Sequence, residues 1–387
     1  MAYRRRKEFL VFGAPAIQEE EIAEVVATLR SGWLGTGPKV GRFEALFRAY
    51  IGAQHALALS SCTAGLHVVM FAAGIKPGDE VITSPLTFAA TANAILHAGA
   101  TPIFADVEPG TLNLDPEQVN KQITPRTRAI IPVHLYGRPC NMDALLDIAQ
   151  RHQLLFIEDA AHAIEAIYRG RRMGTFGLAG CFSFYVTKNV ITAEGGMVTT
   201  NNDEIADKIK ILSLHGLSRD AWKRYSDSGY RHYEVIYPGF KYNMTDIQAS
   251  LGIHQLNRVE VNLKRREAIW ARYDAAFSDL PVDVPPLAEN NTRHARHLYT
   301  LLLRFDKIKM SRDEFLVRLQ EENIGAGVHF ISLHLQKYYR ETFGYQPEDF
   351  PVATEASRRT VSLPLSPKLT DQDVDDVISA VRHVLRS

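Results

Sequence analysis

The first two-thirds of the chain alternate between short apolar runs rich in β-branched residues and longer runs with helical periodicity. The helix-like runs each follow a strand-like run and span residues 62–74, 87–99 and 141–153. Such alternation predicts βαβ units and a mostly parallel sheet with helices on both faces. Ligands of these sheets bind beyond the carboxyl ends of the strands, so polar residues at those ends deserve the closest reading. The strand-like runs span residues 55–61, 79–84, 101–107, 127–137, 153–160, 180–185 and 196–200.

The pattern changes after about residue 245. Residues 244–277 have the periodicity of one long connecting helix, and a strand candidate, a helix capped by Ser311 and a closing helix at 370–385 follow. We therefore expect a large domain over residues 1–250, and a connecting helix with a small α+β domain over 251–387. The polar and aromatic segment 218–235 has little periodicity and is interpreted as a surface excursion or lid.

Composition and charge narrow the class of protein. Of the 387 residues, 44 are basic and 44 acidic, so the chain has no net charge that would attract nucleic acid or an anionic membrane. Three scattered cysteines suit a reducing compartment and predict neither a disulfide framework nor a metal cluster. The apolar patch near the start is too short for a secretory signal, and no run approaches the roughly 18 apolar residues of a spanning helix. We expect a cytoplasmic protein.

Several residues capable of chemistry lie at the ends of predicted strands. Asp159 follows a buried strand, with His162 three residues later, and Ser183 interrupts an apolar strand. Ser61–Thr63 turns from strand to helix, where backbone N–H groups can bind an anion. Each has an ordinary structural explanation: a helix N-cap for Asp159 and for Ser61–Thr63, a packed core side chain for His162, and a satisfied hydroxyl for Ser183. Phe88, at the start of a helix, would normally be core.

Lys188 makes the set specific. It lies in a polar bend between two apolar strands, with Gly195–Gly196 close behind. Burial there favours the neutral amine, which is the form that attacks a carbonyl. A helix N-terminus for a phosphate, an aromatic face, a carboxylate for a ring nitrogen and a lysine are together what pyridoxal 5′-phosphate (PLP) requires. The first strand–helix turn lacks G-x-G-x-x-G, which disfavours a dinucleotide-dependent dehydrogenase.

The motifs "SSCTAGL", "FIEDAAHA", "FSFYVTKNVITAEGGMVTT" and "GFKYNMTDIQASLGIHQL" occur in this order. Together they resemble the DegT-type sugar-nucleotide aminotransferases, a family of fold type I PLP enzymes with the aspartate-aminotransferase fold. The resemblance runs from roughly residue 9 to the C-terminus. Within the family, further segments are most similar to enzymes that aminate a UDP-linked 4-keto pentose. Cys62 and Val186 depart from residues common in the family, without removing a functional group.

The resemblance implies a role for each matching residue. Lys188 would be the Schiff-base lysine, Asp159 would hold the pyridine nitrogen, and His162 would lie near the ring. Phe88 would stack on the ring, and His329 would approach the substrate. The phosphate would be held by Cys62, Thr63, Ala64 and Ser183, with Asn243 reaching the phosphate of the other subunit's cofactor. The resemblance thus also implies a homodimer.

The expected activity is transfer of an amino group, with PLP passing through its pyridoxamine 5′-phosphate form. L-glutamate is the expected donor and a nucleotide-linked keto sugar the acceptor. The pathway would make amino sugars for cell-surface polysaccharide, lipopolysaccharide or a glycosylated metabolite. Two alternatives remain open from the sequence: an acceptor that is a ketocyclitol or an aminobenzoate precursor, and a PLP-binding regulator without turnover. Because Lys188 is a lysine and not a histidine, amino transfer is favoured over dehydration.

Overall fold

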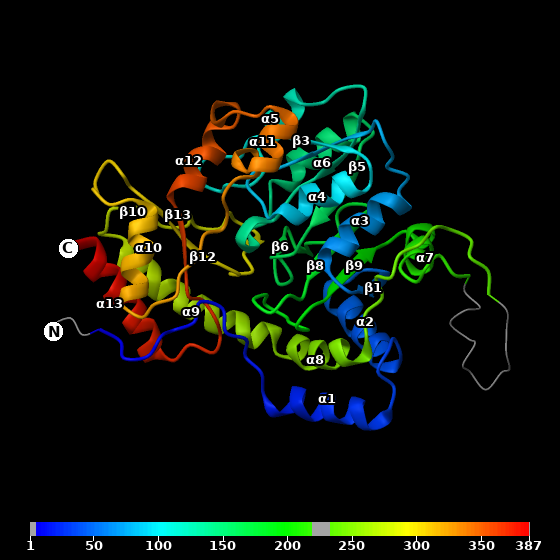
Figure 1. Cartoon of the computed structure of the whole chain (residues 1–387), viewed down its shortest axis with the longest axis horizontal. Helices are drawn as coiled ribbons and strands as arrows, with labels where there is room; N and C mark the ends of the chain where they lie inside the picture. Colours follow the sequence, from blue (N-terminus) through cyan, green and yellow to red (C-terminus); the bar gives the residue numbers. More distant parts are fainter. Residues whose placement is uncertain (1–4, 219–232, 387) are drawn as a thin grey trace.

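A seven-stranded sheet forms the centre of the computed structural model, which describes residues 5–218 and 233–386 (Figure 1). Most of the lid candidate 218–235 lies outside the described residues. The strand order is β1-β9-β8-β5-β4-β2-β3. The strands are β1 His55–Leu59, β2 Glu80–Thr83, β3 Thr101–Phe104, β4 Thr127–Ile131, β5 Leu155–Asp159, β8 Ala179–Ser183 and β9 Gly196–Thr200.

Five neighbouring strands of this sheet run parallel, and β9 pairs antiparallel with both β8 and β1. The predicted mostly parallel sheet is therefore confirmed. In the register of β5 and β8, Asp159 lies opposite Cys181, so the end of β5 is at the middle of the sheet edge. The bend with Lys188 joins β8 to β9 at this same edge.

Alternate residues of each strand pack on opposite faces, as the continuous apolar runs require. Phe156 faces a core formed with α2, α6 and α8, whereas Ile157 faces a core formed with α3, α4 and α7. Both side chains are buried. These helices are α2 Pro38–Ile51, α3 Cys62–Ala72, α4 Ala89–His97, α6 Met142–Arg151, α7 Asp203–Leu212 and α8 Asp246–Asn257.

A second, three-stranded antiparallel sheet lies in the C-terminal part, in the order β10-β12-β13. Its apolar residues share a core with α9, α10 and α13. The first and last described segments of the chain lie beside this part of the molecule, where Arg6 pairs with Asp373 and Asp376 of α13 (Figure 1). The elements are β10 Val282–Asp283, β12 Tyr299–Leu303, β13 Thr360–Leu363, α9 Val259–Phe277, α10 Arg312–Glu321 and α13 Asp371–Arg386. The division of the chain at residues 250 and 251 stays a prediction.

The expected single helix over 244–277 is wrong in one respect, because the structure has two helices, α8 and α9. Arg258 separates them with φ −101° and ψ 0°, outside ordinary helical values. Its guanidinium pairs with buried Glu21 of α1, Glu19–Ser31, which packs on α8. The sequence pattern could not foresee a contact with a helix more than 200 residues earlier.

Other elements complete the chain and were not predicted from periodicity. Among the described residues, no helix is both long and apolar enough to pass through a lipid bilayer. The remaining elements are α1 with α5 Pro116–Lys121, α11 Lys337–Phe343, α12 Pro351–Arg359, and the three-stranded sheet of β6 Ile167–Tyr168, β7 Arg171–Arg172 and β11 Thr292–Arg293.

Candidate active site

Asp159 is the last residue of β5 and is buried. Its carboxylate accepts hydrogen bonds from the Thr91 hydroxyl (2.8 Å) and from the backbone N–H of Ala161 (3.2 Å). A turn follows, so Asp159 is not the N-cap of a helix. Burial raises the pKa of this carboxyl above its ordinary value, against the opposing effect of those hydrogen bonds. No ammonium or guanidinium of the described residues lies in ion-pair contact with it.

Lys188 lies in the bend between β8 and β9, in line with its predicted position between two strands. Burial of the amine lowers its pKa to about 8, although the nearby Cys62 and Asp159 act in the opposite direction. The predicted desolvation is thus present in the structure. At pH 7.5, such an amine is neutral in about a quarter of molecules, against about 0.1% for a free lysine.

The N-terminus of α3 opens towards the same edge of the sheet. Ser61 is the N-cap, and its hydroxyl accepts from the Ala64 backbone N–H at 3.0 Å. The backbone N–H groups of Cys62 and Thr63 have no acceptor among the described residues. The predicted helix start is therefore present, with Ala64 occupied by the cap and two N–H groups left for an anion.

Gly196 brings β9 against this helix start. A Cβ on Gly196 would lie 2.4 Å from the Cys62 nitrogen, so no larger residue fits without moving backbone. Ser183 pairs with Gly196 in the register of β8 and β9, which places it beside the same turn. Within the described part of the chain, the Ser183 hydroxyl accepts only a long hydrogen bond from the Tyr185 N–H (3.4 Å). Gly196 thus allows β9 to lie directly against the start of α3.

Phe88 precedes α4, and its side chain is 62% exposed rather than part of the core. Its ring contacts Phe330, with centroids 5.9 Å apart, and Phe330 stacks on His162 at 6.1 Å. An exposed aromatic face therefore continues into the buried histidine. Phe88 and Phe330 also line a groove of about 700 Å³.

Three histidines lie near the Lys188 amine. His162 and His297 are buried with ring centroids 4.4 Å apart, and His329 bonds to the Ser362 hydroxyl at 2.8 Å. Burial lowers the pKa of all three, and the Lys188 charge lowers it further, to about 4 for His329. These rings are neutral at physiological pH, so they can donate or accept hydrogen bonds without adding positive charge.

Sequence reasoning missed a buried network that anchors the lysine bend. The Asn189 amide donates to Glu165 (2.8 Å) and to the Ala295 carbonyl (3.1 Å), and its oxygen lies 3.1 Å from Nδ1 of His297. Glu165 in turn pairs with buried Arg266 of α9. The only available signal was the position of Asn189 next to Lys188. Its partners lie 24 to 108 positions away in the chain and have no motif.

Asn243 is bridged to Leu59 at the end of β1, the strand next to β9. Its amide donates to the Thr36 hydroxyl at 2.6 Å. The Asn243 side-chain oxygen is buried and has no partner among the described residues. Because an unsatisfied buried acceptor is unfavourable, a donor from outside this chain is expected there.

The residues present fit PLP. Asp159 is a buried carboxylate without an ion pair among the described residues, which a protonated ring nitrogen would supply. The two open N–H groups of α3 suit a phosphate. The lowered pKa of the Lys188 amine increases its neutral fraction, and the neutral amine is the form that bonds to an aldehyde. All three groups belong to one edge of the sheet.

Comparisons with known proteins identify the family. Its model, described as the DegT/DnrJ/EryC1/StrS aminotransferase family, matches residues 15–382. The spore coat polysaccharide biosynthesis protein SpsC of Bacillus subtilis is 52% identical over 384 residues, 99% of each chain.

Two solved structures have the same fold. The PLP form of the Streptococcus pneumoniae sugar aminotransferase homologue Spr1654 superposes with a TM-score of 0.90 at 32% identity, over 98% of this chain and 99% of that one. DesI, solved with its TDP-sugar product, superposes with a TM-score of 0.87 at 31% identity, over 99% and 94%. The chain belongs to the DegT/DnrJ/EryC1/StrS aminotransferase family and is a PLP-dependent aminotransferase of fold type I.

Proposed function

We propose that this enzyme transfers the amino group of L-glutamate to a keto sugar carried on a nucleotide, in amino-sugar biosynthesis for a cell-surface polysaccharide. The observation that carries the chemistry is the Lys188 amine, whose pKa is about 8, beside Asp159 and the three neutral histidines. An open groove lined by Phe88 lies next to this cluster. A reactive centre and a large acceptor site therefore adjoin.

In this proposal Lys188 holds the cofactor, Asp159 pairs with its ring nitrogen, and Phe88 and His162 lie against its ring. Its phosphate is held by the backbone N–H groups of Cys62 and Thr63 at the start of α3, together with Ser183. The Ala64 N–H, which the resemblance also assigned to the phosphate, is bonded to the Ser61 hydroxyl instead. PLP supplies an aldehyde that carries the amino group between substrates and a ring that accepts an electron pair. His329 lies on the substrate side, next to Phe330.

The residues of the chain would divide the proton transfers between them. When Lys188 is free, its amine can take a proton from the donor's α-carbon and return it, because a pKa of about 8 lies close to the working pH. Asp159, as a buried carboxylate, favours the protonated ring. The Asn189–Glu165–Arg266 network keeps the lysine bend in place during both half-reactions. His162 accepts from the Tyr136 N–H at Nδ1, so its Nε2 carries the proton as a neutral donor.

A nucleotide-linked sugar is favoured by the relatives and by the size of the groove. SpsC is named for spore coat polysaccharide biosynthesis, and DesI was solved with a TDP-sugar. The groove of about 700 Å³ lies within the range of small-molecule sites. Aromatic rings and amides suit a base and a sugar, and they include Phe88, Asn93, Phe330, Gln336 and Tyr338.

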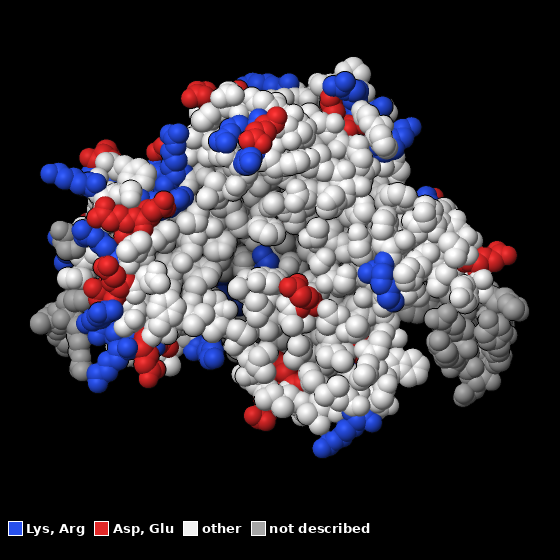
Figure 2. Space-filling view, in the orientation of Figure 1, with Lys and Arg blue, Asp and Glu red and all other residues white. Residues whose placement is uncertain are grey.

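We propose a homodimer in which Asn243 completes the phosphate site of the partner. Asn243 and the exposed Trp33 line the same hollow of about 400 Å³. The Asn243 amide donates one N–H to the Thr36 hydroxyl, so its second N–H can serve the phosphate, while its unpartnered oxygen, an acceptor, can take a hydrogen bond from a donor of the partner. Figure 2 shows few charged side chains on the surface over α3, α4 and α8, as is typical of a surface covered by a partner. Exposed apolar side chains include Trp33, Leu34, Phe88, Tyr185, Ile236 and Tyr237.

Borohydride reduction of the holoenzyme, followed by peptide mass spectrometry, tests the role of Lys188. We expect the pyridoxyl group on Lys188 and no turnover by Lys188→Ala. A Lys188→Ala protein with wild-type activity would refute the assignment.

A second experiment compares acceptors directly, UDP- and dTDP-linked keto sugars against ketocyclitols, with glutamate as donor. Faster turnover of a ketocyclitol would overturn the sugar-nucleotide proposal and leave the aminotransferase intact.

A further inference from the structure

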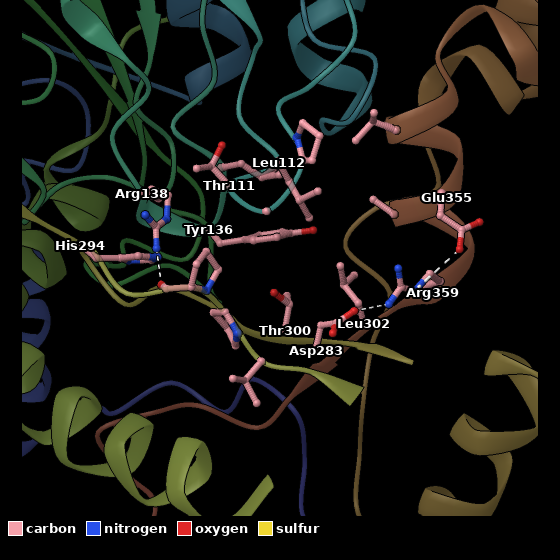
Figure 3. A pocket seen from close by; sticks show the side chains of 18 of the residues that line it. Thr111, Leu112, Tyr136, Arg138, Asp283, His294, Thr300, Leu302, Glu355 and Arg359 are labelled. Atoms are coloured by element: carbon pink, nitrogen blue, oxygen red, sulfur yellow. Dashed lines mark hydrogen bonds and ion pairs between the residues drawn. The ribbon is translucent and has the colours of Figure 1, made fainter. Parts of the chain in front are cut away.

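A second cavity lies on the other side of Tyr136 from the histidine cluster. It has a volume of about 480 Å³ and shares no lining residue with the Phe88 groove. On one side are the loop 109–112 and the 3₁₀ turn Leu135–Gly137, which follow β3 and β4, and on the other are β10, β12 and α12 (Figure 3). The cavity thus lies between the two sheets, where a ligand could contact both.

Most of the cavity wall is apolar, and three buried polar side chains interrupt it. Arg138, His294 and Thr300 are only 4%, 4% and 6% exposed, respectively. Figure 3 shows Tyr136 between Arg138 and Thr300, at the middle of the cavity wall. The apolar wall consists of Pro109, Leu112, Leu135, Trp270, Val284, Pro285, Pro286, Leu302, Pro351 and Val352.

All three of these polar groups have unused hydrogen-bonding capacity. His294 accepts the Arg296 N–H at Nδ1 (2.9 Å), so the proton of the neutral ring is on Nε2, for which the described residues offer no acceptor. The Thr300 hydroxyl likewise has no partner among them. Arg138 is engaged with Glu289 and with the carbonyls of Pro286 and Leu287, which leaves two of its five N–H groups. All of this spare capacity can serve a ligand that accepts hydrogen bonds.

Charge near His294 favours an anion. Burial lowers the pKa of His294 well below its ordinary value, and the guanidinium groups of Arg296 and Arg138 lower it further. Acidic residues elsewhere in the cavity are already paired: Asp283 with Arg359 and Arg304, and Glu355 with Arg359. Glu289, the partner of Arg138, has a side chain 55% exposed to solvent. Two half-buried carboxylates outside the cavity wall offset part of this charge, Glu108 near Arg138 and Asp274 near Arg296. Among the described residues that line the cavity, however, no carboxylate pairs with Arg138 or His294, so its buried end can attract an anion.

We infer that this cavity is a binding site for a small carboxylate with an apolar, preferably aromatic, body. The carboxylate meets Arg138, His294 and Thr300, and the body lies against Trp270 and the aliphatic wall. A volume of about 480 Å³ suits a ligand of drug-like size or smaller.

Tyr136 connects this site to the active site. Its backbone N–H donates to Nδ1 of His162 (3.2 Å), its carbonyl accepts from the His297 N–H (3.1 Å), and its hydroxyl donates to the His329 carbonyl. One residue therefore contacts all three histidines near Lys188, while its ring forms part of the cavity wall. A ligand packed on that ring changes the position of the histidines. This connection, unlike the binding itself, rests on the proposed function.

Calorimetric titration of the PLP-loaded enzyme with 2-naphthoate tests the site, and 2-naphthamide is the uncharged control. We expect the carboxylate to bind about tenfold more tightly than the amide. Thr300→Val removes the hydroxyl without changing the shape of the side chain, and it is expected to lower the affinity for 2-naphthoate about tenfold. Thr300→Ser keeps a hydroxyl and is expected to bind 2-naphthoate as the wild type does. Val352→Trp fills the cavity and should abolish binding, with Val317→Trp, on the exposed surface of α10, as its control.

Phe88→Ala separates this site from the active site, since it is expected to leave 2-naphthoate affinity unchanged. Absence of binding, affinity unaffected by Thr300→Val and Val352→Trp, or loss of binding in Phe88→Ala alone would each overturn the proposal.

The connection between this site and the active site is measured through the visible absorbance of the bound cofactor. Saturating 2-naphthoate should shift its pH titration in wild type and shift it less in Tyr136→Phe, which keeps the ring and both backbone contacts and loses only the hydroxyl bond to the His329 carbonyl. A wild-type titration unaffected by the ligand contradicts the role of Tyr136, while the calorimetry still reports on the site.

Discussion

Lys188 shows how burial can outweigh neighbouring charge at a single residue. Cys62 and Asp159 both favour its protonated form, yet loss of hydration dominates and brings the pKa from 10.5 to about 8. Burial likewise disfavours the charged form of Asp159, because it raises the pKa of the carboxyl despite two hydrogen bonds. Without a cofactor, both groups are buried at an energetic cost. A bound cationic ring and covalent attachment would relieve both.

Lys188→Met is predicted to stabilise the cofactor-free protein by roughly 1–3 kcal/mol at pH 7. The pKa of the lysine is lower in the folded protein than in the unfolded chain, so burial of the protonated amine lowers the free energy of unfolding. This penalty has its full size below pH 8. That penalty declines as pH rises from about 8 towards 10.5, and the advantage of methionine should decline with it. Urea unfolding at pH 7 and pH 9.5 measures the difference. An equal gain at both pH values would show that the effect is packing, not charge.

Asp159→Asn is expected to slow the glutamate half-reaction by about 100-fold or more, because the ring loses its anionic partner. Thr91→Val removes one hydrogen bond to that carboxylate and should slow it by only about 5- to 10-fold. Stopped-flow absorbance of the loaded enzymes gives both rates. Asp159→Asn at the wild-type rate would remove Asp159 from the mechanism.

At the scale of elements, the start of α3 depends on a strand remote from it in sequence. The helix has an ordinary serine cap, but its open N–H groups face the sheet edge because β9 packs directly behind them. Gly196 is required by that close contact and not by its backbone angles, since its φ is not in the left-handed region. The sequence pair Gly195–Gly196 predicted a close approach, and the structure identifies its partner as Ser61–Cys62.

Gly196→Ala is predicted to lower the free energy of unfolding by about 2–3 kcal/mol, because the added Cβ meets backbone atoms of the α3 start. It should also weaken PLP binding by about tenfold or more, since the displaced N–H groups are those proposed for the phosphate. Gly41→Ala is the control for stability alone, because Gly41 lines the hollow that contains Asn243: the position lies within α2 with open space around it, and alanine should leave the free energy of unfolding unchanged or slightly raised. Denaturant unfolding and cofactor titration measure the two effects, and similar behaviour of both variants would refute the argument.

At the scale of the whole molecule, the chain leaves a buried polar atom of Asn243 unsatisfied. The buried oxygen of Asn243 has no partner among residues 5–218 and 233–386. A second copy of the chain is the proposed source of the missing group. Catalysis would then require residues of two subunits in each site.

Mixing Lys188→Ala subunits with Asn243→Ala subunits tests this arrangement. If each site takes Lys188 from one subunit and Asn243 from the other, half of the randomly exchanged dimers contain one intact site. Activity should then recover to about a quarter of wild type, measured at limiting PLP, although each variant alone is inactive. No recovery after verified subunit exchange would place both residues in the same chain's site and contradict the shared site.

Local patterns predicted the individual elements well. The alternation of strands and helices around β5 and the serine caps of α3 and α10 depend on contacts within a few residues, which a sequence displays directly. The break at Arg258 and the network around Asn189 depend on partners far along the chain, so periodicity contained no sign of them.

The sequence by itself determined the family, the sheet, the lysine between two strands and the carboxylate at a strand end, because motif order and hydrophobic period are properties of the linear chain. Only the tertiary structure decided that His297 joins His162 and His329 near Lys188, with Tyr136 touching all three. It also created the cavity between the two sheets. Both features arise where segments more than 100 residues apart pack together, and desolvation at such contacts, unlike residue type, exists only in the folded chain.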